Sequence, residues 1–316
     1  MKDYILILSS MYDFSTDLVV QRLEKNGDDY IRLNKEQLSD YEIFLDPVNP
    51  KLRITGGNVN LETSKIKSVW FRQPVFLRNT PGRMIDINEQ LSLSQWNAFL
   101  RGLMVFEEAY WMNWPQATYA AESKPYQLMI AKKIGFCVPQ TIISNSLGFN
   151  LITSDRFIIK SLDTVLLKEN DDCYFTYTSN VSPNDFSLEQ TRQAPITFQE
   201  YVDDKLDIRV TVIDSKVYAV AIKENGYGIA TDWRTKKKDD LQYIDIELPE
   251  HIKRLCVDYV KLLGLKYGAI DFIKTSDNFV FIEINPTGEW GWLSNAEREI
   301  DFEISKRLSE AKSNVS

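Results

Sequence analysis

The chain reads YGAIDFIKTSDNFVFIEINPTGEW at residues 267–290, and this stretch predicts a β hairpin that carries three oxygen ligands. Two apolar runs flank a turn at residues 276–278, which sets Asp271 opposite Glu283. Glu283 and Asn285 are two residues apart and therefore share one face of their strand. Carboxylate and amide oxygens are ligands of hard cations, so we predict an Mg²⁺ site at these three residues. The alternative is a hairpin whose acids face water, and the apolar residues on both strands favour the metal.

The composition is that of an ordinary globular protein. The chain has 316 residues, of which 44% are hydrophobic and 26% are charged, enough for two or three compact lobes. A formal charge of −8 argues against a general nucleic-acid binder, which needs a basic face. Its three cysteines predict neither a disulfide framework nor a zinc site, and one histidine leaves no basis for histidine catalysis. The opening MKDYILILSS is too short to span a membrane and has no cleavage pattern, so we expect a cytoplasmic protein.

The first third of the chain predicts a small open α/β lobe. Tyr4–Ser9 is a buried strand by its apolar run, residues 15–26 are helical, and residues 28–33 form a second strand. The first strand is not followed by the glycine fingerprint of dinucleotide-binding folds. Residues 86–110 form a long helix by periodicity. We assign residues 1–112 to this lobe.

The rest of the chain predicts two further lobes. Short strands and polar loops indicate a small central β-rich lobe at residues 113–195. Residues 196–316 contain a strand, a long hairpin, a helix and then the hairpin at 267–290, which indicates a C-terminal lobe of sheet and helices. The expected fold class is therefore α/β (α+β) in three lobes.

Two lysines are candidates for binding phosphate. Lys124 precedes a helix, and Lys160 ends the apolar strand FIIK, so its ammonium emerges from a rigid element. Either lysine alone is more often a solvated surface charge. Beside an Mg²⁺ site they are better explained as part of a polyphosphate site, which needs several cations around it.

The segment Gln199-Glu200-Tyr201-Val202 is a candidate for binding the base of a nucleotide. It joins the central and C-terminal lobes, where a linker offers backbone groups to a purine edge. Asp207 and Arg209 follow at alternate positions of one strand and face the same side. Such neighbours usually form an ion pair. In a nucleotide site, Asp207 would instead contact ribose or metal, and Arg209 the γ-phosphate or a substrate carboxylate.

Taken in order, these residues resemble the ATP-grasp ligases from about residue 113 to the end of the chain. The decapeptide FIEINPTGEW at residues 281–290 is similar to the F-x-E-x-N-P-x-G-x-W ending of the graspetide and microviridin ligases, which mature ribosomally made peptides. VWFRQP at residues 69–74 resembles the W-[YF]-R-x-P element of that group, and Asn113 with K-x-x-Q-L at residues 124–128 also fits. One departure is clear: residues 161–178 contain no glycine where many ATP-grasp enzymes have a glycine-rich loop.

The resemblance implies an ATP-grasp fold that uses ATP and Mg²⁺. A carboxylate would attack the γ-phosphate, and a nucleophile would capture the acyl phosphate. Arg72, Arg209 and Arg234 are candidates for holding the substrate carboxylate, because a planar guanidinium suits carboxylates and phosphates. For Arg72 and Arg234 the alternative of ordinary surface arginines stays open.

The narrower resemblance implies that the substrate is a precursor peptide with a leader segment. Its Asp or Glu side chains would be joined to Ser or Thr hydroxyls as esters, or to Lys amines as amides. The hairpin at residues 209–223 is the candidate for leader binding, and the family suggests a homodimer. One alternative is an ATP-grasp ligase that adds an amino acid to a peptide or small acid. Another is a non-catalytic nucleotide-binding protein, which the retained metal and lysine residues disfavour.

Overall fold

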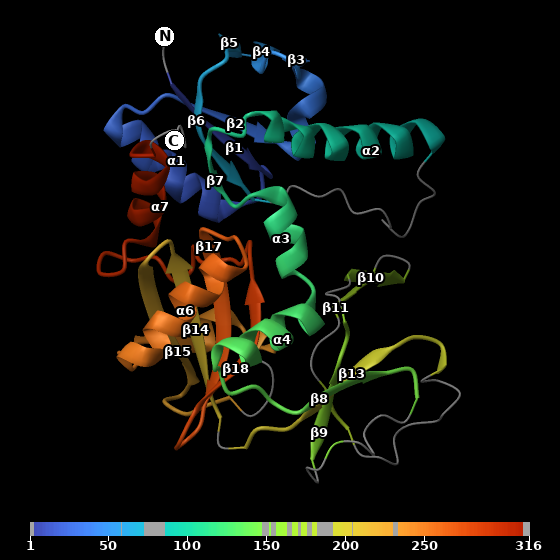
Figure 1. Ribbon diagram of the computed structural model, residues 1–316, viewed down its shortest axis with the longest axis vertical. Helices are drawn as coiled ribbons and strands as arrows, with labels where there is room; N and C mark the ends of the chain where they lie inside the picture. Colours follow the sequence, from blue (N-terminus) through green and yellow to red (C-terminus); the bar gives the residue numbers. More distant parts are fainter. Residues whose placement is uncertain are drawn as a thin grey trace.

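The structure is a computed structural model, and its described residues form five β-sheets, with helices beside the N-terminal and C-terminal sheets (Figure 1). It describes residues 3–57, 59–72, 86–146, 152, 156–162, 166–169, 172–175, 179–181, 192–203, 205–229 and 233–311. The described residues contain no helix that is both long enough and apolar enough to cross a membrane. The mixed α/β class predicted from the sequence is confirmed.

The N-terminal sheet is parallel, with strand order β2-β1-β6-β7. Its strands are β1 (Tyr4–Ser9), β2 (Tyr30–Asn34), β6 (Ile66–Phe71) and β7 (Tyr110–Met112). The run YILILS suits β1 because a central strand of a parallel sheet is covered on both faces. Helix α1 (Phe14–Asn26) follows β1, and a three-stranded meander of β3 (Glu42–Asp46), β4 (Lys51–Gly56) and β5 (Val59–Thr63) precedes β6. The predicted open α/β arrangement is therefore present.

The helix predicted at residues 86–110 is shorter in the structure. Helix α2 runs from Ile87 to Gly102, a 3₁₀ turn covers Leu103–Val105, and the chain then enters β7. Glycine favours a helix end, and Leu103 and Phe106 are buried in the core beside the N-terminal sheet. Tertiary packing therefore ends a helix that periodicity alone would extend.

The central sheet is antiparallel, with strand order β12-β9-β13-β8. Helices α3 (Pro115–Ala121) and α4 (Lys124–Ile134) lead into it from the N-terminal sheet (Figure 1). The glycine-free segment after Lys160 contains a two-stranded hairpin of β10 and β11. The strands are β8 (Thr141–Ser144), β9 (Phe157–Lys160), β10 (Leu166–Glu169), β11 (Asp172–Phe175), β12 (Ser179–Val181) and β13 (Ile196–Glu200).

The C-terminal sheet is antiparallel, with strand order β16-β15-β14-β17-β18. Helices α4 and α6 (Glu250–Leu262) pack against one face through a core that includes Ile208, Val210 and Phe281. A second core joins this sheet to the N-terminal sheet and to helices α1 and α7 (Ile300–Ser309), so the two sheets form one packed unit. The strands are β14 (Leu206–Ile213), β15 (Lys216–Glu224), β16 (Leu241–Asp245), β17 (Tyr267–Lys274) and β18 (Phe279–Asn285).

The β17–β18 hairpin has the predicted register, but its turn differs from the one predicted. Its turn has four residues, 275–278, because Lys274 pairs with Phe279. That turn alone would shift the pairing by one residue and move the Glu283 side chain to the other face. A bulge after Asp271 restores the register, so Asp271 pairs with Glu283. The predicted pairing is confirmed, and the predicted three-residue turn is wrong.

Candidate active site

Asp271, Glu283 and Asn285 lie together on the β17–β18 hairpin, at a cavity of about 260 Å³. Asp271 and Glu283 are paired across the two strands, and Asn285 lies two residues further along β18. The cavity is lined by these three residues and by Arg209, Trp233, Lys236, Leu241, Glu289 and Trp292. The hairpin therefore brings the three predicted oxygen ligands to one hollow of the molecule.

Arg209 binds Asp271 from the neighbouring strand β14. The two residues are paired in register, and Nη1 of Arg209 donates to both carboxylate oxygens at 2.8 and 2.9 Å. Burial alone would lower the pKa of Arg209, but the Asp271 carboxylate raises it, so the guanidinium stays charged. Its Nε is buried and has no hydrogen-bond partner among the described residues. An unsatisfied buried N–H costs about 1–3 kcal/mol.

Both predicted phosphate-binding lysines lie at the edge where the central sheet approaches the hairpin. Lys124 Nζ is 3.8 Å from Glu283 Oε2 and donates to the carbonyl of Ser161 at 3.3 Å. Lys160, the residue before Ser161, donates to Gln199 Oε1 at 2.9 Å. The structure thus places two ammonium groups between the candidate metal ligands and the segment predicted to bind the nucleotide base.

The segment Gln199-Glu200-Tyr201-Val202 ends strand β13 and continues into the next loop. Gln199 is buried, with its side chain held by Lys160 and by Thr141 Oγ1 at 3.0 Å. The backbone N–H groups of Glu200 and Tyr201 donate to Gln140 O at 2.9 Å and Arg156 O at 3.0 Å. These two groups are therefore not free, contrary to the expectation that the linker offers its amides to a purine.

Asp207 and Arg209 do not pair with each other. Asp207 accepts from Lys205 Nζ at 3.1 and 3.2 Å, whereas Arg209 reaches across to strand β17. The two charges on β14 thus have separate partners. Asp207 does not line the cavity, and its predicted contact with ribose or metal stays a prediction.

Arg72 is a buried residue at the end of β6, so the alternative of a surface arginine is wrong for it. Its side chain is 4% exposed and donates to Asp13 Oδ2 at 2.9 Å, Thr287 O at 3.0 Å and Glu289 Oε1 at 3.1 Å. Burial acts to raise the pKa of Asp13, but the charge and hydrogen bonds of Arg72 hold it below the ordinary value. Arg72 therefore links the N-terminal sheet to the loop after β18 through hydrogen bonds.

The third predicted arginine is only partly described. The backbone of Arg234 lies in a 3₁₀ turn, Trp233–Thr235, whose Trp233 lines the cavity. The side chain of Arg234 and residues Gln73 and Pro74 of the VWFRQP element lie outside the described part of the chain. The role proposed for Arg234 stays a prediction.

Three residues of the site were not predicted from the sequence: Glu289, Asp13 and Ser15. Glu289 lines the cavity, and its Oε2 accepts from Ser15 Oγ at 2.6 Å, while its Oε1 accepts from Arg72. One signal was available for Glu289, because it lies between Gly288 and Trp290 of the quoted decapeptide. Ser15 carries no local signal, because its partner Glu289 is 274 residues away. Asp13 has a local signal as the N-cap of α1, where it accepts from the N–H of Thr16, but this signal does not reveal its ion pair with Arg72, 59 residues away.

Two buried amides hold the hairpin in place. Asn113 accepts the N–H groups of Lys266 and Tyr267 at 2.8 and 2.9 Å and donates to the carbonyls of Tyr267 and Pro286. Gln127 of α4 donates to and accepts from the backbone of Ile284, at 2.9 and 3.0 Å. These residues position Glu283 and Asn285 by fixing the backbone on both sides of them.

Gly288 leaves room for Arg209, and its replacement by alanine tests this packing. A Cβ at Gly288 would lie 2.6 Å from Ala269 Cβ and 2.8 Å from Arg209 Nη2. We expect Gly288→Ala to lower the free energy of unfolding by about 1–3 kcal/mol, measured by urea denaturation. Gly102→Ala is the control, because a Cβ there meets nothing within 4 Å and alanine suits a helix end. Equal stability of the two variants would contradict the crowding.

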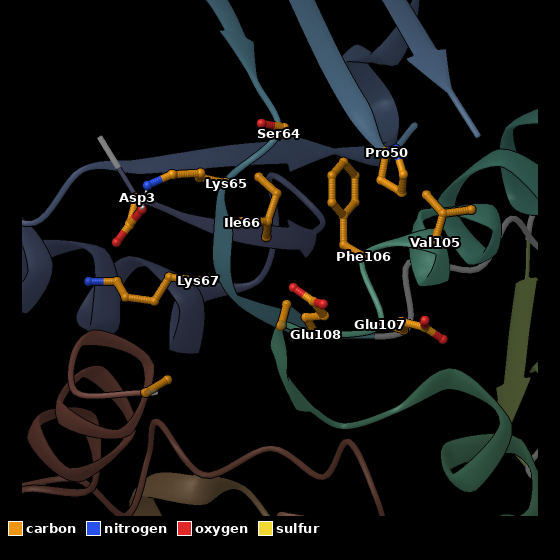
Figure 2. Close-up of a pocket in the computed structure, with 12 residues that line it drawn as sticks. Asp3, Pro50, Ser64, Lys65, Ile66, Lys67, Val105, Phe106, Glu107 and Glu108 are labelled. Atoms are coloured by element: carbon orange, nitrogen blue, oxygen red, sulfur yellow. Dashed lines mark ion pairs between the residues drawn. The ribbon is translucent and has the colours of Figure 1, made fainter. Parts of the chain in front are cut away.

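A larger cavity, of about 550 Å³, lies on the N-terminal side of the molecule (Figure 2). Its wall is formed by the start of β6, with Lys65, Ile66 and Lys67, and by the segment from Phe106 to Glu108. None of the predicted site residues lines it. Size alone does not make it the candidate active site.

The residues at the hairpin fit a magnesium ion. Two carboxylates and one amide oxygen are the hard donors that Mg²⁺ takes, and water and phosphate oxygens complete its shell. Each carboxylate already faces a cation, Arg209 for Asp271 and Lys124 for Glu283. Among the described residues no cluster of three or more His, Cys, Asp or Glu side chains could hold a metal, so the amide of Asn285 is needed as the third donor.

Two family models match the chain. Residues 4–117 match the MvdD pre-ATP grasp domain, and residues 179–311 match the RimK-like ATP-grasp domain. A curated relative, the tetrahydromethanopterin:alpha-L-glutamate ligase of Methanocaldococcus jannaschii, is 28% identical over 116 residues. That alignment covers 35% of this chain and 38% of the relative.

Solved structures match the whole chain. The RiPP-associated ATP-grasp ligase of Chryseobacterium gregarium, in complex with ADP and a leader and core peptide, has a TM-score of 0.84 at 26% identity and covers 97% of this chain and 96% of its own. The macrocyclase MdnC of Microcystis aeruginosa, bound with precursor peptide MdnA, gives 0.82 at 24%, covering 98% and 100%. The ligase PsnB, complexed with a precursor variant, Mg and ADP, gives 0.77 at 20%, covering 98% of each chain.

Proposed function

Because the chain belongs to the ATP-grasp ligases and is most like their graspetide-type members, as its sequence predicted, we propose that it is an ATP-dependent peptide macrocyclase. It activates Asp or Glu side chains of a ribosomal precursor peptide and joins them to hydroxyls or amines of the same peptide. The observation that carries this proposal is the pairing of Asp271 with Glu283, beside Asn285, in a cavity that also holds an arginine.

The charges of the site suit attack of a carboxylate on ATP. Two anions repel each other, and Lys124, Lys160 and Arg209 supply positive charge where they meet. When bound at Asp271, Glu283 and Asn285, Mg²⁺ would neutralise phosphate charge and align the phosphoryl oxygens. Asp207 is assigned to the nucleotide, and Gln199-Glu200-Tyr201-Val202 to its base, through groups other than the two engaged N–H groups.

The substrate carboxylate is assigned to the arginines. Arg209 is the residue for which the geometry gives most support, because it lines the cavity and its guanidinium is held in place by Asp271. Its fork can hold a carboxylate while the γ-phosphate is transferred. Arg72 supports the substrate carboxylate only indirectly, because its donors already bind Asp13, Thr287 and Glu289. Arg234 is assigned to the same carboxylate from the loop at the cavity.

The proposal is tested by incubating the protein with ATP, Mg²⁺ and the short peptide encoded beside its gene. Intact-mass spectrometry should show loss of one water per ring, with one ADP released for each ring. A peptide that keeps its mass while ATP is consumed would contradict macrocyclisation.

A second candidate is a ligase that adds an amino acid to a peptide or small acid. The curated glutamate ligase among the relatives favours it, and it shares every nucleotide contact named above. The same mass experiment separates the two functions, because ligation adds the mass of an amino acid residue and cyclisation removes water. Including free L-glutamate in a parallel reaction completes the test.

Lys160 gives a direct test of the nucleotide site. We expect Lys160→Met to weaken ATP binding roughly ten- to a hundred-fold, because a charge-assisted hydrogen bond to phosphate is lost. The dissociation constant is measured by titration with a fluorescent ATP analogue. Lys133→Met is the matched control, since Lys133 is an exposed residue at the end of α4. Equal affinities of both variants would remove Lys160 from the site.

A further inference from the structure

We propose that Glu289 binds the ammonium group of the nucleophile, so that this enzyme forms amide rather than ester rings. The inference rests on the proposed function and goes further, because it names the substrate class of the acceptor. Glu289 lies in the cavity with Asp271, Glu283 and Asn285, and its side chain is 58% exposed. It is the lining carboxylate on the side of the N-terminal sheet.

The Glu289 carboxylate is held rigidly although it is exposed. Oε1 accepts from Arg72 Nη2 at 3.1 Å, and Oε2 accepts from Ser15 Oγ at 2.6 Å. Both donors are themselves fixed, Arg72 by Asp13 and Ser15 by the N–H of Gly291 at 3.2 Å. A surface carboxylate has no need of such support. A carboxylate that positions a substrate does, because its orientation sets the reaction geometry.

The two glycines beside Glu289 extend this support. A Cβ at Gly291 would lie 2.6 Å from Phe14 Cε1 and 2.8 Å from Ser15 Oγ, and a Cβ at Gly288 would crowd Arg209. The loop therefore lies against α1 on one side and against the C-terminal sheet on the other. Glu289 is held between them with its exposed side chain at the cavity.

The local charges favour a cation as ligand. Asp13 and Glu289 share the single guanidinium of Arg72, so this group carries one negative charge more than its cation balances. The other lining charges are already paired: Asp271 with Arg209, Glu283 with Lys124 and Lys236 with Glu224. An incoming ammonium would balance Glu289, whereas a neutral hydroxyl would not.

The aromatic residues that line the same cavity suit the aliphatic stem of a lysine. Trp233 and Trp292 line the cavity with ring centroids 5.4 Å apart, and Tyr243 packs on Trp292 at 4.7 Å. Aromatic faces attract ammonium groups and cover the methylenes of long cationic side chains. A serine or threonine hydroxyl is too short and too polar to use such a wall.

The electrophile and the nucleophile would then meet beside one another. Arg209, which we assign to the activated carboxyl group, donates from Nη2 to the backbone carbonyl of Glu289 at 3.3 Å. Arg209 also lines the cavity, so its guanidinium lies where an oxygen of the substrate would enter. The site thus offers a donor for the acyl oxygen and an acceptor for the amine.

Amide formation removes two protons from the ammonium nitrogen and one phosphate from the acyl group. The ammonium gives one proton to Glu289, and the amine nitrogen forms a bond to the carbon of the acyl phosphate. The bond from that carbon to the phosphate oxygen breaks, and phosphate leaves with the electron pair and takes the second proton from nitrogen. The products are an amide, inorganic phosphate and the ADP released in the activation step.

Binding of small probes tests the ammonium site without requiring turnover. We expect Nα-acetyl-lysine amide to bind the full-length protein, in the presence of a non-hydrolysable ATP analogue and Mg²⁺, roughly ten-fold or more tightly than Nα-acetyl-threonine amide. Glu289→Gln should remove this preference, and Glu289→Asp should restore part of it. Glu297→Gln, at an exposed position of the loop before α7, is the matched control. Equal binding of both probes to the wild-type protein would overturn the inference.

Two further measurements separate this inference from the proposed function. L-Glutamate binding more tightly than Nα-acetyl-lysine amide would support an ammonium site and assign the amine to a free amino acid. With the precursor peptide, rings that survive mild alkali are amides and support the inference. Rings that reopen with gain of water are esters and overturn it, while macrocyclisation itself stands. A peptide that is never cyclised, together with a lysine preference in the probe assay, would count against the function alone.

Discussion

Glu283→Gln should abolish ring formation and leave the protein folded. Loss of a metal-binding carboxylate removes charge stabilisation worth several kcal/mol, so we expect the rate to fall roughly a thousand-fold. The cost in stability should be small, because the Glu283 side chain is 19% exposed and its partner Lys124 is 3.8 Å away and 25% exposed. The rate is measured by mass spectrometry of the precursor peptide, and stability by urea denaturation.

Asp271→Asn should have the same effect on the reaction with a larger effect on stability. Arg209 is nearly fully buried and relies on both oxygens of Asp271, so the variant leaves a buried guanidinium short of its anion. Breaking such a pair costs about 3–5 kcal/mol. Asp277→Asn, in the exposed turn of the same hairpin, is the control and should behave as the wild-type protein. Normal dehydration of the precursor by either active-site variant would rule out the proposed metal site.

The hairpin could be predicted from the sequence because its signals are local. Side chains alternate along a strand, so Glu283 and Asn285 had to share a face, and a polar turn between apolar runs marked the hairpin. The four-residue turn and the bulge after Asp271 could not be predicted from the sequence. Each shifts the strand pairing by one residue, and the two shifts cancel. The predicted register was right through this cancellation.

The environment of Arg72 could not be predicted in the same way. Its partners Asp13, Thr287 and Glu289 are 59, 215 and 217 residues away in the sequence. They meet only because the N-terminal and C-terminal sheets share one core, to which both contribute buried side chains. A charged residue that is buried by such long-range contacts carries no local pattern. For the same reason the hydrogen bond between Ser15 and Glu289 was not predicted.

Arg72→Met should destabilise the protein about as strongly as Asp271→Asn. It leaves Asp13 buried and unpaired and releases Glu289 and the carbonyl of Thr287, so we expect a loss of about 3–5 kcal/mol in the free energy of unfolding. Arg72→Lys should recover only part of this loss, because one ammonium cannot reach three acceptors that a planar fork reaches. Arg254→Met, at an exposed position of α6, is the matched control.

The pH dependence of stability distinguishes this ion pair from a packing effect. In the wild-type protein Arg72 holds the pKa of Asp13 below its ordinary value of 3.8. A carboxyl with a lowered pKa stabilises the fold above pH 3.8, and that contribution is lost as the pH falls through the folded-state pKa. In Arg72→Met the lowering effect of Arg72 is lost, while burial still raises the pKa of Asp13 and the hydrogen bonds from Thr16 still lower it. The pKa of Asp13 therefore lies above its wild-type value, and protonation relieves part of the cost of the buried charge. The stability of the variant should therefore fall less steeply with acid, and the difference between the two proteins should shrink below pH 3.8. A difference in unfolding free energy that stays constant with pH would mean that Arg72 contributes through packing alone.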